Sequence, residues 1–209
     1  MSVLNKVAYF QNRRDEVPNQ RLAAELAKTR DTKGIREIAD NLRNGNPSIQ
    51  ADCLKVLYEV GYINPRLVSD YVEDFLELLK SKNNRLVWGA MIGLSTIAAE
   101  QSAAIGRHAD AIIETMNKGS VITVDNGIRT LAVVASKQPK LKKKLVAFLF
   151  DHLRRCRAKD VPQHSEKILV AVDSGTKSQF IKVLDSRLSE FNASQARRVS
   201  KLIRQTQGK

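Results

Sequence analysis

The strongest constraint in the sequence is a segment that recurs every 37 residues. Residues 83–98 read NNRLVWGAMIGLSTIA, and residues 120–135 read SVITVDNGIRTLAVVA. In both segments, and again one period earlier, small or apolar residues return at spacings of three and four, which predicts a helix with one buried face. The aligned positions are Ile49, Cys53, Leu57 and Val60, then Leu86, Ala90, Leu94 and Ile97, then Thr123, Gly127, Leu131 and Val134.

A second predicted helix keeps the same period between these segments. Its aligned positions are Ile35, Ile38 and Leu42; Val72, Phe75 and Leu79; Ala109, Ile112 and Met116; and Val146, Leu149 and Leu153. The expected helix starts are marked by Pro47, Pro65, Pro139 and Pro162, and the expected ends by Gly45, Gly61, Gly119 and Gly175. The best strand candidate, VITV at 121–124, falls on the first turn of a helix in this register. We therefore predict an all-α fold.

The repeat also predicts the domain organisation. We expect an N-terminal helical cap at residues 1–31 and one continuous domain at 32–209. The expected helical pairs lie at 32–62, 64–100, 102–138, 140–175 and 177–207. A single pair cannot bury its apolar face alone, so its stability must come from neighbouring pairs. The last pair is shorter and polar on one side, as a terminal cap would be.

The unit NPRLVSDYVEDFLELLKSKNNRLVWGAMIGLSTIAAEQ resembles the repeats of the HEAT and armadillo-like superfamily of α-solenoids. An apolar first helix, a polar turn at Asn83–Arg85 and a second helix rich in small residues carry this resemblance, which covers nearly all of the chain beyond residue 31. It implies a right-handed α-α superhelix of about five HEAT-like helical pairs, whose second helices line a concave groove. The period is nearer to that of tetratricopeptide repeats, but their residue pattern is absent. Such a fold fixes shape and leaves activity open.

Composition constrains the partners of the chain more than its chemistry. Residues 136–209 hold 18 Lys and Arg against 6 Asp and Glu, whereas residues 1–135 hold 17 against 16. Cys53 and Cys156 lie in apolar segments and are expected to be buried thiols in a reducing environment. We find neither a signal-peptide pattern nor a membrane-spanning stretch, and we expect a cytoplasmic protein with no membrane association. Its oligomeric state is not predicted.

Four residues are candidates for a binding groove. Trp88 and Asp125 occupy equivalent positions of adjacent second helices, so we expect them about 10 Å apart. Arg85 lies three residues before Trp88, and Arg129 lies four residues after Asp125. These residue types resemble the base-sensing cleft of the HEAT-like alkylpurine DNA glycosylases, which would imply that Asp125 stabilises positive charge on a sugar. The alternative is that Trp88 packs between repeats and Asp125 makes a cap or an ion pair.

The basic C-terminal third is a second candidate binding surface. The lysines and arginines expected to project from it are Lys142, Lys143, Lys144, Arg154, Arg155, Arg157, Arg197, Arg198 and Lys201. Such a surface suits the phosphates of DNA or RNA, or an acidic protein. The phenylalanines nearby are expected in the core, so no base-stacking platform is predicted. The alternative is a solvated basic face with no partner.

No motif predicts catalysis, a cofactor or a metal site. His108, His152 and His164 belong to three different segments, and His108 falls on a core-facing position. We therefore expect no catalytic residue, no metal ligand and no cofactor. The leading hypothesis is a non-enzymatic scaffold that binds a protein or peptide through its groove and its basic end. The alternative is a nucleic-acid-binding protein related to the alkylpurine glycosylases, with Asp125 as its catalytic residue.

Overall fold

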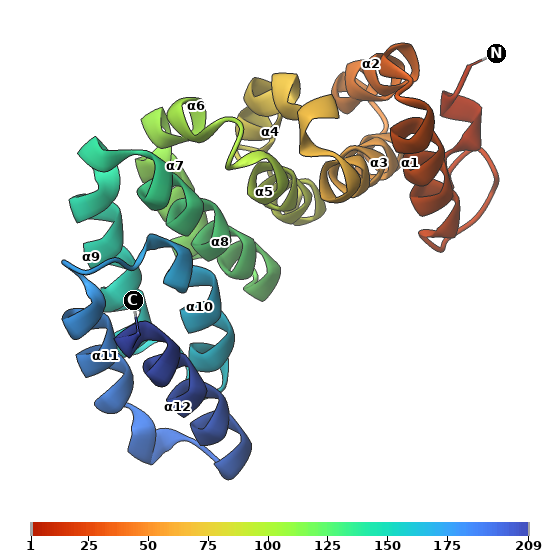
Figure 1. Cartoon of the computed structure of the whole chain (residues 1–209). Coiled ribbons are helices and arrows are strands. Elements are labelled where there is room, and N and C mark those ends of the chain that lie inside the picture. The colour runs from red at the N-terminus through yellow and green to blue at the C-terminus, as the bar shows by residue number, and fades with distance from the viewer. Residues whose placement is uncertain (1, 209) are drawn as a thin grey trace. The chain divides into compact units, whose positions relative to one another are not determined.

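The computed structural model describes residues 2–208, and all regular secondary structure in this range is helical (Figure 1). The helices are α1 (Val17–Thr29), α2 (Thr32–Asp40), α3 (Pro47–Ile63), α4 (Val72–Leu78), α5 (Asn84–Ile97), α6 (Ser102–Arg107), α7 (Ala109–Lys118), α8 (Val121–Lys137), α9 (Pro139–Arg155), α10 (Val161–Ile168), α11 (Lys177–Asp185) and α12 (Ala193–Gln207). The chain divides into two compact units, an N-terminal unit, Met1–Gly127, and a C-terminal unit, Ile128–Lys209.

The N-terminal unit is built from two layers of helices. α3 packs between α1 and α5, while α2 and α4 pack on the other side of α3 and α5 (Figure 1). Contacts between neighbouring helices join residues about one period apart: the Asn19 amide donates to Asp52 across 33 residues, and Gly89 abuts Leu54 across 35. Equal offsets along the chain thus become lateral neighbours in this unit. The core between the layers is fully buried at Ile38, Leu57, Phe75 and Leu94.

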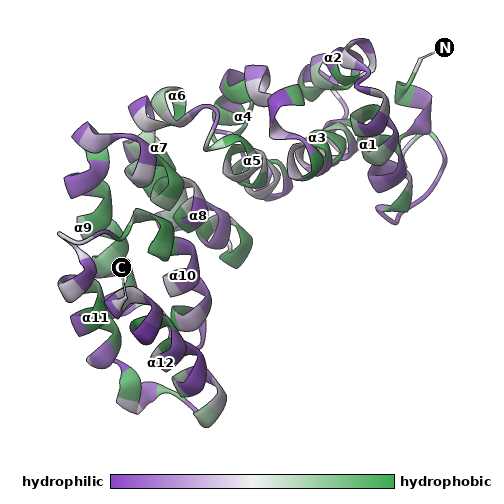
Figure 2. Cartoon of the chain, in the orientation of Figure 1, coloured by the Kyte–Doolittle hydropathy of each residue, from purple (hydrophilic) through white to green (hydrophobic). Residues whose placement is uncertain are grey.

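The C-terminal unit continues the same spacing. Arg187 donates to the carbonyl of Leu153 across 34 residues, and Arg198 pairs with Glu166 across 32. The rings of Phe150 and Phe180 meet in the core, with centroids 5.6 Å apart. Figure 2 shows α12 as largely hydrophilic, in contrast to α5. The buried residues of α12 are Val199, Leu202, Ile203 and Thr206, all on one face.

The predicted helical pairs are confirmed to within a few residues, and two local departures have physical causes. α8 begins at Val121, as the repeat register predicts for VITV. The first helix of the pair at 102–138 is split into α6 and α7, because the backbone at His108 leaves the helical region. The first helix of the preceding pair starts with 3-10 turns at 65–67 and 69–71 before α4. Pro65 opens the first of these turns.

The predicted helix starts are confirmed, whereas one predicted helix end is wrong. Pro47 and Pro139 open α3 and α9, and Gly119 follows the last residue of α7. Gly61 instead lies buried inside α3, where an added Cβ would stand 2.2 Å from Oγ1 of Thr96 on α5. A glycine at this position permits close packing of two helices and does not end one. Among residues 2–208, no helix is long and apolar enough to cross a membrane.

Candidate functional site

Trp88 lies on the face of α5 that meets α3, at a narrow crevice. The crevice is lined by Glu16, Ala51, Leu54, Lys55, Tyr58, Arg85, Trp88 and Gly89. Trp88 is half-buried and lines this crevice together with residues of α3. The side chain of Arg85, one turn earlier on α5, is half-exposed. The two residues therefore mark one edge of the α1–α3–α5 face.

Asp52 organises the polar end of this face. It is 7% exposed, and its carboxylate accepts hydrogen bonds from the backbone N–H of Tyr9 (2.8 Å) and from Nδ2 of Asn19 (2.9 Å). The carbonyl oxygen of the Asn19 amide in turn accepts from the backbone N–H of Ala8 (2.9 Å). Arg85 approaches the same carboxylate from α5, at 4.0 Å. This network fixes the segment before α1 against α3.

A cavity of about 530 Å³ opens beside Asp52. Its lining residues are Ala8, Tyr9, Asn12, Arg13, Arg14, Asp15, Ser48, Asp52 and Arg85. Arg13 is paired with Asp15 at 2.7 Å, and this hydrogen bond lowers the pKa of Asp15. Arg85 lines both this cavity and the crevice of Trp88, so the two hollows adjoin. The segment at 8–15 was not among the predicted site residues, because it lies outside the repeat and only the tertiary fold brings it beside α3 and α5.

Lys55 places a buried positive charge between the crevice and the core. Its ammonium group contacts Glu16 at 2.8 Å and Glu59 at 2.6 Å, and it lies 4.9 Å from the centre of the Tyr58 ring. Burial alone would lower the pKa of Lys55, but its hydrogen-bond partners raise this pKa above its usual value. Burial raises the pKa of Tyr58 to about 12. The positive charge of Lys55 on the α1–α3–α5 face is therefore held between two carboxylates.

The remaining predicted groove residues lie on α8. Asp125 is half-buried in the N-terminal unit, whereas Arg129 is exposed and belongs to the C-terminal unit. The neighbouring Asn126 contacts Ser95 of α5 at 3.2 Å, which places the start of α8 beside α5. The side-by-side arrangement of Trp88 and Asp125 stays a prediction.

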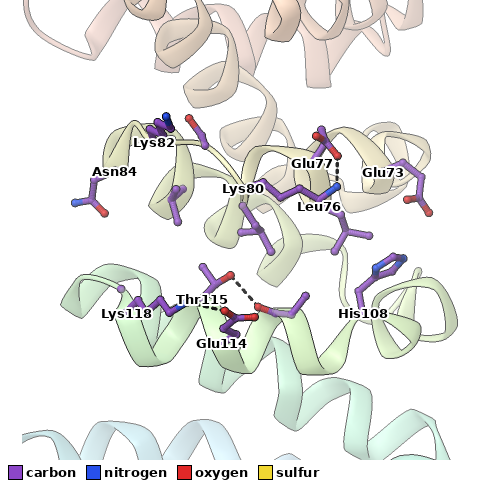
Figure 3. A pocket seen from close by; sticks show the side chains of 15 residues that line it. Glu73, Leu76, Glu77, Lys80, Lys82, Asn84, His108, Glu114, Thr115 and Lys118 are labelled. Carbon is purple, nitrogen blue, oxygen red and sulfur yellow. Dashed lines mark hydrogen bonds and ion pairs between the residues drawn. The ribbon is translucent and has the colours of Figure 1, made fainter.

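A second cavity, of about 460 Å³, lies between α4 and α7 (Figure 3). Its rim carries two lysine–glutamate pairs, Lys80 with Glu77 and Lys118 with Glu114. His108 is exposed at one end of this cavity, so the prediction that it packs in the core is wrong. Its position at the break between α6 and α7 turns the imidazole outward.

The basic residues of the C-terminal unit are mostly at the surface. This unit holds 19 Lys and Arg against 6 Asp and Glu. Four of the predicted binding cations contact carboxylates: Lys142 pairs with Asp173, Arg155 with Asp151, Arg157 with Asp160 and Arg198 with Glu166. The hydrogen bond from Lys142 lowers the pKa of Asp173 to about 2. The exposed cations among the other predicted residues are Lys143, Lys144, Arg154, Arg197 and Lys201.

Two histidines that lie apart in the sequence meet in the C-terminal unit. Nε2 of His152 on α9 and Nδ1 of His164 on α10 are 2.9 Å apart, and Cys156 lies beside them. Cys156 follows His152 by one helical turn, a spacing that the expectation of no metal ligand did not take into account. That spacing was the available signal, while the position of His164 depends on the packing of α10 against α9.

No protein-family model and no curated protein sequence matches the chain. Among solved structures, an engineered protein is 17% identical with a TM-score of 0.68 over 100% of both chains. A designed armadillo repeat protein is 11% identical with a TM-score of 0.68 over 97% of each chain. Another designed armadillo repeat protein, solved in complex with the peptide (KR)4, is 11% identical with a TM-score of 0.67, over 88% of this chain and 86% of that chain. At these identities the likeness concerns the fold, and the chain has an all-α, armadillo-like helical-repeat fold.

Proposed function

We propose that the chain is a non-catalytic helical-repeat scaffold that binds a peptide segment of a protein along the α1–α3–α5 face. The observation that carries this proposal is that Trp88 and Arg85 line one crevice on α5, and that Arg85 also lines the adjoining cavity. Tryptophan and arginine are the side chains most enriched among residues that dominate binding energy at interfaces. Both are partly exposed on one turn of α5, and their surroundings are held in place by Asp52 and Lys55.

The chemistry of this face suits an extended chain. The half-exposed guanidinium of Arg85 offers donors to peptide carbonyls or to a carboxylate, and the indole of Trp88 offers an apolar surface with one N–H donor. The cavity of about 530 Å³ has room for a partner side chain. The peptide complex of a designed armadillo neighbour supports this mode of binding for the fold. A rigid, preformed face also lowers the entropic cost of association.

The basic C-terminal unit supplies a second contact in this proposal. Five of its six carboxylates are ion-paired, namely Asp151, Asp160, Glu166, Asp173 and Glu190. Its large excess of cations therefore leaves an electropositive surface. Such a surface attracts an acidic segment of the partner and speeds its encounter. An acidic stretch of the partner is thus the segment that this unit would bind.

We expect Trp88→Ala and Arg85→Ala each to weaken peptide binding by about tenfold or more, because each removes a side chain of the type that anchors interfaces. The probe is a peptide selected from a random displayed library against the full chain. Trp88 is the only tryptophan, so its intrinsic fluorescence reports binding in the unmodified protein and in the Arg85 variant. Fluorescence anisotropy of the labelled peptide gives the dissociation constants of all variants.

The matched control for this experiment is Lys118→Ala, an exposed residue on the rim of the cavity between α4 and α7. It should leave the affinity unchanged. Selected peptides whose affinity survives both Trp88→Ala and Arg85→Ala would overturn the assignment of the α1–α3–α5 face. Binding that is instead lost in the Lys118 variant would move the site to the cavity between α4 and α7.

The charge of the C-terminal unit also favours nucleic acid as a second candidate partner. If duplex DNA binds there, the logarithm of its affinity should fall linearly with the logarithm of salt concentration. Replacing Lys142, Lys143 and Lys144 with alanine should then reduce that slope by about 2 to 3, at 0.9 per phosphate contact. The control replaces Lys80, Lys82 and Lys118, which changes the net charge equally in the other unit. Equal slopes for both triple variants, or no binding of a 20-base-pair duplex at low salt, would exclude DNA as the partner of this surface.

A further inference from the structure

The end of α9 and the start of α10 bring together three side chains that are typical metal ligands. His152 comes from the last turn of α9, Cys156 directly follows the last residue of that helix, and His164 comes from the first turn of α10. The two imidazole nitrogens and the thiol sulfur all lie within 4.8 Å of one another. The sequence spacing is His-x3-Cys-x7-His, so the cluster closes a short loop between two helices.

Local structure fixes each member of the cluster. Cys156 follows the end of α9, four residues after His152, and its sulfur lies within 4.8 Å of the imidazole nitrogen of His152. His164 is 3% exposed, and its ring centre lies 4.9 Å from that of His152. His152 and Cys156 are each half-buried. The site is thus enclosed on the side of His164 and open on the other, where a water molecule could reach a bound ion.

The charges around the cluster are already balanced. Arg187 donates to the backbone carbonyl of Cys156, but its guanidinium is paired through two nitrogens with Glu190. Asp160, on the other side, is paired with Arg157 at 2.6 Å. Burial raises the pKa of the Cys156 thiol, so binding of a metal ion as thiolate would displace its proton.

We propose that His152, Cys156 and His164 form a binding site for Zn²⁺, with water as the fourth ligand. Two imidazoles and one thiolate are the donors that this borderline-soft cation prefers, and three protein ligands with an open fourth position are common at such sites. Zinc–nitrogen bonds of about 2.0 Å in a tetrahedral site put the two nitrogens about 3.3 Å apart. The observed 2.9 Å therefore needs an opening of only a few tenths of an ångström, which side-chain rotation supplies.

A bound ion would join the end of α9 to the start of α10. The ligands span 13 residues of chain, and the closed loop contains the 3-10 turn Ala158–Asp160. Binding of the ion to the folded state alone would stabilise the C-terminal unit by linkage. The alternative use of the cluster is a hydrogen bond between two neutral imidazoles, with no metal. The metal site and the histidine–histidine hydrogen bond differ in whether the Cys156 thiol takes part.

The test uses the reduced, chelator-treated full chain with Co²⁺ as a spectroscopic probe and Zn²⁺ as its competitor. We expect one equivalent of Co²⁺ to give tetrahedral ligand-field bands and a thiolate-to-cobalt charge-transfer band, and Zn²⁺ to displace both. Cys156→Ser should abolish the charge-transfer band, and His152→Ala should weaken binding at least tenfold. His108→Ala, which removes an exposed histidine of the other unit, should change nothing.

Cys53 serves as the internal control for the thiol. It is fully buried in the N-terminal unit, where burial raises its pKa to about 12. A charge-transfer band that persists in Cys156→Ser would therefore overturn the proposal. So would the absence of saturable Co²⁺ binding in the unmodified protein. Circular dichroism of Cys156→Ser confirms that it is folded, and a melting temperature that rises with Zn²⁺ only in the unmodified protein would support the site.

Discussion

Replacing Asp52 with alanine should lower the free energy of unfolding of the N-terminal unit by about 2–4 kcal/mol. The Asp52 carboxylate is buried and accepts two hydrogen bonds, from the backbone N–H of Tyr9 and from the amide of Asn19. Hydrogen bonds to a charged group contribute about 1.5–3 kcal/mol each, and removing the acceptor leaves a buried amide donor without its partner. The segment at 8–15 would then lose its attachment to α3.

The measurement for Asp52→Ala is urea unfolding followed by fluorescence. Trp88 and all four tyrosines lie in the N-terminal unit, so aromatic fluorescence reports that unit alone. Hydrogen exchange at the amide of Tyr9 should accelerate in parallel. Asp70→Ala is the control, because Asp70 is exposed and such substitutions usually change stability by less than about 0.5 kcal/mol.

Asp52→Asn refines the same prediction. The asparagine amide keeps one acceptor oxygen but turns its NH2 donor toward one of the two donors that Asp52 binds. We therefore expect the free energy of unfolding to fall by more than in Asp70→Ala and by less than in Asp52→Ala. Equal stability of Asp52→Ala and Asp70→Ala would show that water replaces the carboxylate, and that the N-terminal segment is held by Val7 and its other apolar contacts.

The repeat period predicted the helices well because burial of one apolar face determines both the sequence pattern and the structure. The predicted pairs end within a few residues of the observed ones, from α2 to α12. The same logic failed at Gly61, because a small residue serves equally to end a helix and to let two helices approach closely. Only the position of Thr96 on the neighbouring helix distinguishes these uses.

The candidate site was less predictable because its polar contacts depend on tertiary packing and, at residues 8–16, on a segment outside the repeat. Arg85 and Trp88 share a turn of α5, which the helical period predicts directly. The approach of Asp52 to Arg85 and the ion pair of Glu16 with Lys55 do not follow from the apolar pattern. Glu16 lies within the predicted cap, just before α1, and its side chain is half-exposed, so the sequence carries no signal of its partner. The His152–Cys156 spacing was visible in the sequence, but its third member depended on tertiary packing.

Replacing Arg187 with alanine should lower the stability of the C-terminal unit by about 2–4 kcal/mol. Arg187 is 8% exposed, and its guanidinium donates to the carbonyls of Leu153 (2.6 Å) and Cys156 (2.9 Å) and to Glu190. The last carbonyls of a helix have no partner within it, and here the guanidinium supplies one for the end of α9. Each such bond to a charged donor is worth about 1.5–3 kcal/mol, less the cost of burying the charge.

Fluorescence does not report this unit, so the measurement is amide hydrogen exchange by mass spectrometry, with peptides covering α9 and α11. Protection of these peptides should fall in Arg187→Ala, while that of α3 and α5 stays unchanged. Arg187→Lys should lose most of the same stability, because one ammonium group cannot reproduce a planar fork that spans two carbonyls and a carboxylate. Arg204→Ala, an exposed site on α12, is the control. If Arg187→Lys is as stable as the unmodified protein, a positive charge alone suffices at this position and the guanidinium does not cap α9. If Arg187→Lys instead loses as much protection as Arg187→Ala, the planar guanidinium is what connects α9 to the end of α11.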